Sequence, residues 1–240
     1  MSSVDVALVV LLSLIGFTLQ GSVGFGMGLL CSPTFLLIDA RLVPGPVLTS
    51  TLVFTTLLAL REHEGIDLGG LRWAVGGRVL GTVPAAWLLV VLPSEGLTLL
   101  LGLVVLVAVA LSISGLRVRP RPSALVVGGV LSGLMGTIAA IGGPPLALLY
   151  QHAPGPRVRG TLSGLFLPGT VVSIVSLVVV GRYGVQELRL SLLLLPGALL
   201  GFLWSRGLAT RLDRGYTRPA VLLAATIAGL IVIGRSLASW

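Results

Sequence analysis

Two glycine-rich stretches interrupt long apolar runs, and their residue types suit the binding of an anion. The first, GSVGFGMGLLCSP, covers residues 21–33, and the second, SGLMGTIAAIGGPP, covers residues 132–145. Glycine permits a turn and lets an anion approach the backbone amides closely, and the N-terminus of a helix attracts negative charge. Pro33, Pro144 and Pro145 suit the first turn of a helix that restarts, because their missing N–H costs nothing there. We therefore expect two interrupted helices whose breaks form an anion site.

A single arginine, Arg78, lies inside an apolar stretch, WAVGGRVLGTVP. An ionisable residue within a membrane segment marks a functional site by default. The alternative is that Arg78 snorkels to the membrane interface from one or two turns below it. Neither Asp nor Glu occurs inside an apolar segment, so proton coupling would require His152, a loop carboxylate or protonation of the substrate itself.

Polar side chains and glycines around the two stretches complete the set of candidate substrate ligands. Each hydroxyl could instead bond to its own helix backbone, and the glycines could serve close helix packing. With Arg78, the candidate substrate-binding residues are Gln20, Gly21, Ser22, Gly24, Gly26, Ser32, Pro33, Thr49, Ser132, Gly136, Thr137, Gly142, Gly143, Pro144 and Thr161. We assign four further glycines to helix packing rather than to the site: Gly77, Gly81, Gly197 and Gly201.

The composition requires a membrane environment. The chain has 240 residues, of which 55% are hydrophobic and 10% are charged, whereas soluble domains carry about 25% charged residues. Apolar runs near the roughly 20 residues needed to cross the hydrocarbon core recur along the chain. We therefore predict an all-α integral membrane protein in contact with the lipid bilayer, with a single domain over residues 1–240.

Several other function classes are not supported by the residues present. All 16 basic residues are arginines in a chain of net charge +8, and most lie in short loops, where the positive-inside rule and anionic lipid explain them. We therefore expect no nucleic-acid partner. One cysteine and two distant histidines argue against a metal site or a disulfide framework. No nucleotide-binding or catalytic motif stands out, so we predict no enzyme activity, no metal and no cofactor.

Glycine, proline and charge divide the apolar sequence into eight segments. Segments 1 and 5 are unusually long and contain the two glycine-rich stretches. The predicted segments are residues 3–39, 44–61, 71–92, 95–115, 124–152, 158–181, 188–206 and 218–237.

The two halves of the chain resemble each other, which predicts an internal repeat. At an offset of 112 residues, the residues Gly16, Gly21, Gly24 and Pro33 match Gly128, Gly133, Gly136 and Pro145. At an offset of 120 residues, Gly77 and Gly81 match Gly197 and Gly201. We therefore predict two four-segment repeats, over residues 1–115 and 116–240.

The arginines predict how these repeats are oriented. If all eight segments cross the membrane, the arginines outside the segment interiors divide 8 to 7 between the two sides. If segments 1 and 5 are re-entrant and turn back at their breaks, the division is 11 to 4, which fits the known bias of short cytoplasmic loops. The richer side then holds Arg61, Arg72, Arg117, Arg119, Arg121, Arg157, Arg159, Arg206, Arg211, Arg214 and Arg218, and the other holds Arg41, Arg182, Arg189 and Arg235.

Re-entrant segments leave three full crossings in each half, so the two repeats become inverted and both termini lie outside. The two limbs of each interrupted segment, at about 13 residues, would reach only about 20 Å, which is short of a ~30 Å hydrocarbon core.

The motifs GFTLQGSVGFGMGLLCSP and GGVLSGLMGTIAAIGGPPLALL, in two four-segment halves, resemble the TauE/SafE sulfite exporter family, also called the toluene sulfonate uptake permease family. The resemblance covers the whole chain. It implies a multi-pass carrier of the cytoplasmic (inner) membrane that moves sulfite, sulfoacetate or related organosulfonates. Many members carry a GGG-like run in the first half, where this chain has Gly24-Phe25-Gly26-Met27-Gly28.

These observations predict a secondary transporter that moves a small anionic substrate by alternating access between inverted repeats. Two alternatives remain open, namely an anion channel and a non-transporting membrane accessory protein. Assembly into a homo-oligomer is also open.

Overall fold

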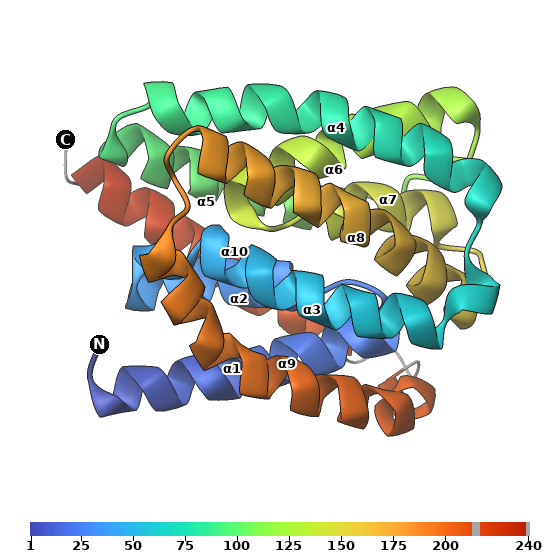
Figure 1. Cartoon of the computed structure of the whole chain (residues 1–240), viewed down its shortest axis with the longest axis horizontal. Coiled ribbons are helices and arrows are strands. Elements are labelled where there is room, and N and C mark those ends of the chain that lie inside the picture. Colours follow the sequence, from blue (N-terminus) through green and yellow to red (C-terminus); the bar gives the residue numbers. More distant parts are fainter. Residues whose placement is uncertain (213–216, 239–240) are drawn as a thin grey trace.

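The computed structural model describes residues 1–212 and 217–238, and every regular element within them is helical (Figure 1). The α-helices are α1 (Ser3–Val23), α2 (Met27–Ile38), α3 (Gly45–Arg61), α4 (Leu68–Val91), α5 (Ser94–Ile113), α6 (Pro122–Ala139), α7 (Gly143–Tyr150), α8 (Gly155–Val179), α9 (Val185–Leu212) and α10 (Thr217–Ala238). Two short 3-10 helices, η1 (Ala40–Leu42) and η2 (His63–Gly65), precede α3 and α4.

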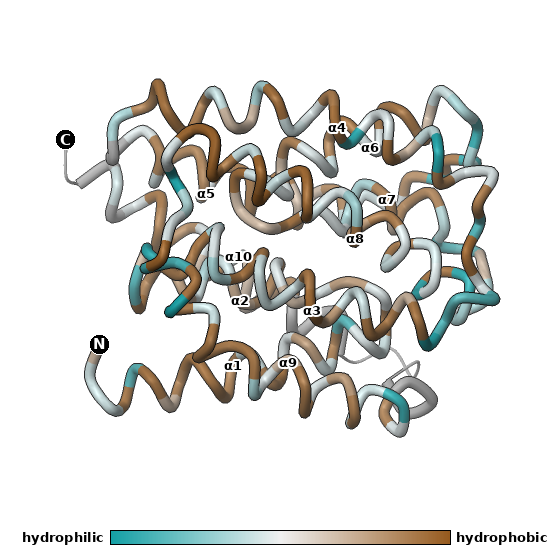
Figure 2. Tube along the Cα trace, viewed as in Figure 1, coloured by the Kyte–Doolittle hydropathy of each residue, from teal (hydrophilic) through white to brown (hydrophobic). Residues whose placement is uncertain are grey.

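The helices have the length and composition of membrane spans. Seven stretches of the described chain are long and apolar enough to cross a bilayer: α1, η1 with α3, α4, α5, α6, α8 and α9. Figure 2 shows hydrophobic residues along most of these helices, with hydrophilic ones mainly at the two ends of the bundle. The prediction of an all-helical integral membrane protein is confirmed.

Both predicted interruptions are present. α1 ends at Val23, where Gly24 adopts a left-handed conformation (φ 98°) and donates its N–H to the Gln20 carbonyl. Gly26 also has a positive φ, 137°, so the three-residue connection to α2 depends on glycine at two of its positions. α6 ends at Ala139, and left-handed Ala140 (φ 57°) caps it before α7 begins at Gly143.

The structure corrects two details of the interrupted segments. Pro33 lies inside α2, which begins six residues earlier at Met27, and so does not start the second helix; Pro144 and Pro145 do lie in the first turn of α7. The limbs are also unequal. With 21 and 18 residues, α1 and α6 reach about 31 and 27 Å, whereas α2 and α7 have only 12 and 8 residues. Glycines with helical φ values do not end a helix, so the first limbs continue until a left-handed residue occurs.

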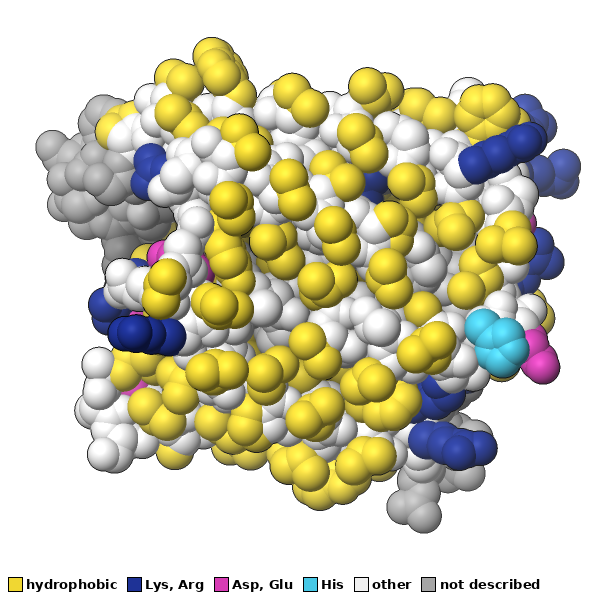
Figure 3. Space-filling view, viewed as in Figure 1, with side chains coloured by type: hydrophobic (Ala, Val, Ile, Leu, Met, Phe, Trp, Pro, Cys, Tyr) yellow, Lys and Arg dark blue, Asp and Glu magenta, His cyan; other side chains and the backbone are white. Residues whose placement is uncertain are grey.

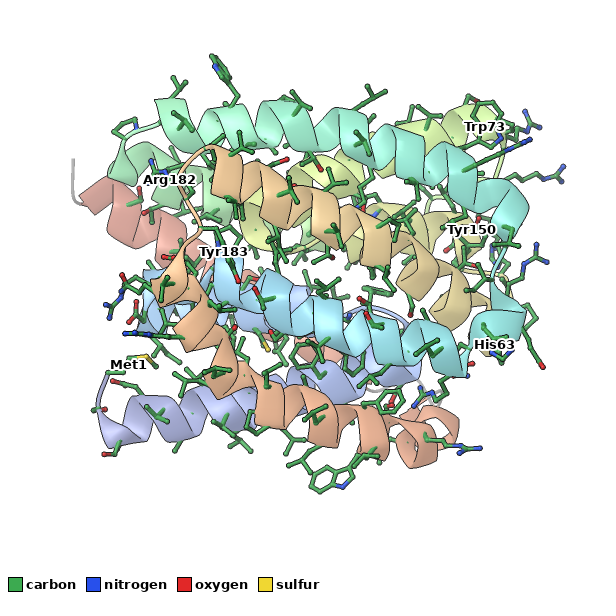
Figure 4. The ribbon with its side chains drawn as sticks, viewed as in Figure 1. Met1, His63, Trp73, Tyr150, Arg182 and Tyr183 are labelled. Atoms are coloured by element: carbon green, nitrogen blue, oxygen red, sulfur yellow. The ribbon has the colours of Figure 1, made fainter. Side chains whose placement is uncertain are left out.

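The bundle has two ends that differ in charge. In Figure 4, His63, Trp73 and Tyr150 lie at one end, and Met1, Arg182 and Tyr183 lie at the other. The side chain of Gln151, just after α7, donates to the Leu116 carbonyl (2.6 Å), so α7 ends beside the loop that leads into α6.

By their contacts and places in the chain, the first end holds Arg61, Arg72, Arg117, Arg119, Arg121, Arg157, Arg159 and Arg206, and the second holds Arg41, Arg182 and Arg189. Figure 3 shows apolar side chains across the middle of one face, between these ends. Arg214, assigned above to the richer side, lies outside the described residues.

Glycines on α4 and α9 bring these helices into close contact with α6 and α1. On α4, a Cβ at Gly77 would meet the backbone of Val126 in α6, and on α9, a Cβ at Gly197 would meet the backbone at Leu14 in α1. Gly197 follows Gly77 by 120 residues, and Val126 follows Leu14 by 112 residues, which are the offsets of the predicted repeat. The pairs formed by Gly81 with Val130 and by Gly201 with Thr18 repeat the same relation.

The close approach of α4 to α6 leads to a prediction with a neighbouring control. Gly77→Ala places a Cβ against the Val126 backbone and should destabilise the folded protein by about 1–3 kcal/mol, whereas a Cβ at Gly76 meets nothing within 4 Å. Thermal unfolding in detergent should therefore show a lower midpoint for Gly77→Ala and an unchanged or slightly higher one for Gly76→Ala. Equal midpoints would contradict the packing described.

Candidate functional site

Arg78 lies near the middle of α4 and is almost completely buried, with 2% of its surface exposed. Its Nη1 donates to Ser132 Oγ (2.6 Å), and Ser132 Oγ in turn donates to the Gly142 carbonyl (2.7 Å). The guanidinium also lies 5.5 Å from the centre of the Phe166 ring. Arg78 is therefore tied to α6 and to the second break, and it does not snorkel to the interface.

Three glycines make room for the guanidinium group. A Cβ at Gly136, at Gly142 or at Gly169 would collide with or press on Arg78 side-chain atoms, at 3.0 Å in the case of Gly136. These glycines come from α6, from the second break and from α8. The absence of their side chains is what allows three elements to surround a planar cation closely.

No carboxylate among the described residues forms an ion pair with Arg78. Its Nε atom is buried and has no hydrogen-bond partner there. Burying one charge without a partner costs several kcal/mol, and the Ser132 hydroxyl and the Phe166 ring offset only part of that cost. The arrangement is therefore suited to holding an anion beside the guanidinium.

A cavity of about 30 Å³ lies beside Arg78, between the two breaks. It is lined by Gln20, Phe25, Gly26, Gly28, Leu29, Leu48, Thr51, Arg78, Gly136, Ala140, Ile141, Gly142, Gly143, Pro144, Phe166 and Thr170. The buried Gln20 Nε2 atom has no hydrogen-bond partner among the described residues. The space is large enough to hold water between the two breaks.

The structure brings together seven of the predicted site residues and places nine elsewhere. Those that line the cavity are Gln20, Gly26, Arg78, Gly136, Gly142, Gly143 and Pro144. Those outside the lining are Gly21, Ser22, Gly24, Ser32, Pro33, Thr49, Ser132, Thr137 and Thr161.

The residues at the end of α1 serve a charged network at the arginine-rich end. Arg61 Nη2 donates to the Gly21 carbonyl (3.1 Å), and Arg159 Nη1 donates to the Ser22 carbonyl (3.4 Å). Glu62 Oε1 accepts from the Nε atoms of both arginines, at 3.3 and 3.1 Å. These two carbonyl groups, which a helix end leaves free, are thereby satisfied by side chains from α3 and α8.

The other predicted hydroxyl residues support the helices around the site. Thr137 bonds Ser173 in α8 (2.8 Å), and Thr49 bonds Tyr183 (2.5 Å). Thr161 accepts from the backbone N–H of residue 67, at the start of α4. Ser132 does not line the cavity, but its hydroxyl accepts a hydrogen bond from Arg78, which does.

At the first break, Gly24 caps α1 near Arg159, and Pro33 lies within α2. Ser32 is also inside α2, fully buried, and its hydroxyl has no hydrogen-bond partner among the described residues.

Several residues of the site were not predicted. Phe25, Phe166 and Thr170 line the cavity, and Gly169 accommodates Arg78. For Gly169, the sequence held a signal, because the Pro168-Gly169 pair lies in the middle of an apolar stretch, as glycine and proline do in the two glycine-rich stretches. α8 nevertheless continues through this pair. The two phenylalanines carried no such signal, since aromatic residues in apolar segments are common.

A model of the sulfite exporter TauE/SafE family matches residues 8–232, a range that includes both breaks and Arg78. The chain belongs to the TauE/SafE family. No curated protein and no solved structure matches the chain. TauE/SafE proteins are membrane transporters, and the seven long apolar helices agree with a multi-pass transmembrane member of that family.

The hydrogen bonds of Ser132 lead to a prediction for this TauE/SafE protein. Ser132→Ala removes the hydroxyl shared by Arg78 Nη1 and the Gly142 carbonyl and leaves Nη1 only the longer bond to the Ser132 carbonyl (3.4 Å), which should cost about 1–3 kcal/mol of stability. Ser50→Ala is the matched control, because the buried Ser50 hydroxyl bonds only carbonyls of its own helix, those of Pro46 and Val47. Thermal unfolding should show a clearly larger loss for Ser132→Ala; equal losses would mean that Ser132 does not hold Arg78.

Proposed function

We propose that this TauE/SafE protein is a secondary transporter that binds a small anion at Arg78 and moves it across the cytoplasmic membrane. The observation that carries the proposal is the buried guanidinium without a carboxylate partner, placed at a cavity between two broken helices. The family description makes sulfite the expected substrate, and the resemblance noted above extends this expectation to organosulfonates.

Three kinds of donor are available to an anion in the cavity. Arg78 offers its Nε–H group and Gln20 its Nε2 amide group, neither of which has a hydrogen-bond partner among the described residues. The first backbone N–H groups of α2 begin at Met27, beside the cavity, and a helix N-terminus favours negative charge. α7 contributes less, because Pro144 and Pro145 remove two N–H groups from its first turn.

Alternating access would arise from movement of one repeat against the other around this site. Two observations support inverted repeats. The chain turns back at each break, and α4 packs on α6 while α9 packs on α1 through glycines at the repeat offsets. The cavity lies where the two breaks meet, which is where transporters of this kind bind their substrates.

The place of the cavity between two broken helices favours a carrier over an anion channel, because secondary transporters bind their substrates at such breaks. A carrier of this type should show saturable uptake into liposomes and exchange of labelled for unlabelled substrate across the membrane. Current that rises linearly with voltage and does not saturate with substrate would favour a channel instead.

The role of Arg78 can be tested in such liposomes. Arg78→Gln should lower sulfite or methanesulfonate uptake by about 10- to 100-fold, because a charge-assisted hydrogen bond contributes roughly 1.5–3 kcal/mol. Arg72→Gln, on the same helix but exposed beside Trp73, should leave uptake unchanged. Size-exclusion profiles and unfolding midpoints identify variants that are folded. Full uptake by a folded Arg78→Gln protein would refute the proposed site.

The proposed orientation places the arginine-rich end in the cytoplasm and both termini outside. Cys31 is fully buried, so introduced cysteines can be labelled against a low background. In intact cells, a membrane-impermeant maleimide should label Arg182→Cys but not Arg119→Cys, and both should react after permeabilisation. Labelling of Arg119→Cys in intact cells would place the arginine-rich end outside the cell and refute the proposed orientation.

A further inference from the structure

We infer that the central site selects singly charged oxyanions, so that sulfite is carried as hydrogen sulfite and organosulfonates are carried as monoanions. This inference rests on the proposed function, because it concerns the charge of the anion that binds beside Arg78.

Arg78 is the one ionisable side chain among the described residues that line the cavity. A guanidinium group keeps its proton in proteins, so it contributes one full positive charge. The other polar side chains of the lining, Gln20, Thr51 and Thr170, are neutral. One bound monoanion therefore brings the net charge of the cavity to zero.

Among the described residues, the elements packed around Arg78 bring no second charge to it. α6 contributes Ser132 and Gly136, and α8 contributes Phe166 and Gly169. α1, α2 and α3 face the cavity with amide, hydroxyl, apolar and glycine residues.

The described carboxylates close to these helices lie at the two ends of the bundle, with Asp5 and Asp39 at the end opposite the arginine-rich one. Glu62 pairs with Arg61 and Arg159, and Asp67 lies 3.5 Å from Arg157. None of these groups lines the cavity. A change of pH therefore leaves the charge of the cavity wall unchanged and acts on the substrate.

Helix dipoles do not supply the missing second charge. A helix N-terminus carries about half an elementary charge, which falls off within one turn. α2 can provide such a partial charge, but α7 has prolines at two positions of its first turn. A dianion would therefore enter a buried site with one full cation, and its second charge would lose its hydration without an equivalent partner.

For sulfite, this selection makes the substrate itself carry the proton. Hydrogen sulfite loses its proton near neutral pH, so its share of total sulfite falls about tenfold for each pH unit above that ionisation. The apparent affinity for total sulfite should fall by the same factor. Methanesulfonate has one negative charge throughout this range, and its affinity should not change.

Isothermal titration calorimetry on the full-length protein in detergent tests the inference with three anions. Methanesulfonate should bind with the same affinity one pH unit below and one unit above the second ionisation of sulfite. Total sulfite should bind several-fold more weakly at the higher of these two pH values. Sulfate, a dianion of similar size, should bind at least about tenfold more weakly than methanesulfonate at both.

The outcomes separate this inference from the proposed function. Equal affinity for sulfate and methanesulfonate, or a sulfite affinity that does not change with pH, would overturn the charge selection while leaving an anion site at Arg78. Failure of all three anions to bind would refute the proposed function, and the inference with it.

A variant with a second cation provides a gain-of-function test. Gln20→Arg adds a positive charge to the cavity wall and should raise the affinity for sulfate relative to methanesulfonate by about tenfold or more. Gln20→Met, of similar size and uncharged, is the matched control and should keep the preference for monoanions. An equal change in the sulfate-to-methanesulfonate preference in both variants would show that size, not charge, sets the selection. If Gln20→Arg does not fold, the measurements on the wild-type protein alone decide the question.

Discussion

The constraint on which the rest of the structure depends is a guanidinium group buried in the middle of a membrane-spanning helix without a carboxylate beside it. Hydrocarbon cannot solvate this charge, so the protein must surround it with dipoles and leave room for an anion. Ser132, the Phe166 ring and the carbonyl at Gly142 form part of this environment. The breaks in two helices follow from the same need, because uninterrupted helices would present no free backbone amides there.

Glycine serves two different purposes in this bundle, and they depend on each other. Gly77 and Gly81 bring the backbone of α4 against α6, which places Arg78 within reach of Ser132. Gly136 and Gly169 then leave the space that the guanidinium fills. A bulkier residue at Gly77 or Gly81 would move α4 away from α6. A bulkier residue at Gly136 or Gly169 would displace the guanidinium group. Either change would therefore damage the site, but by a different route.

Much of the architecture could be predicted from the sequence, because long apolar segments and glycine–proline clusters are strong signals. The helical membrane fold, the positions of both breaks and the burial of a central arginine were within reach of such reasoning. The start of α2 was not, since nothing local distinguishes Gly26 from Gly16 or Gly21 until the backbone conformation is known. Phe25 and Phe166 were missed because their role depends on contacts between segments far apart in the chain.

The two walls of the cavity differ in how readily they can move. The α4–α6 contact around Arg78 is formed by backbones in close approach, so it resists separation without loss of packing on both helices. The opposite wall is built differently, because Phe25 lies between Gly24 and Gly26, both with positive φ values, and it covers Gly143 across the gap. Only a few backbone angles need to change there for the side chain to move. We therefore expect the cavity to widen at the first break, while the half of the site that holds the charge stays fixed.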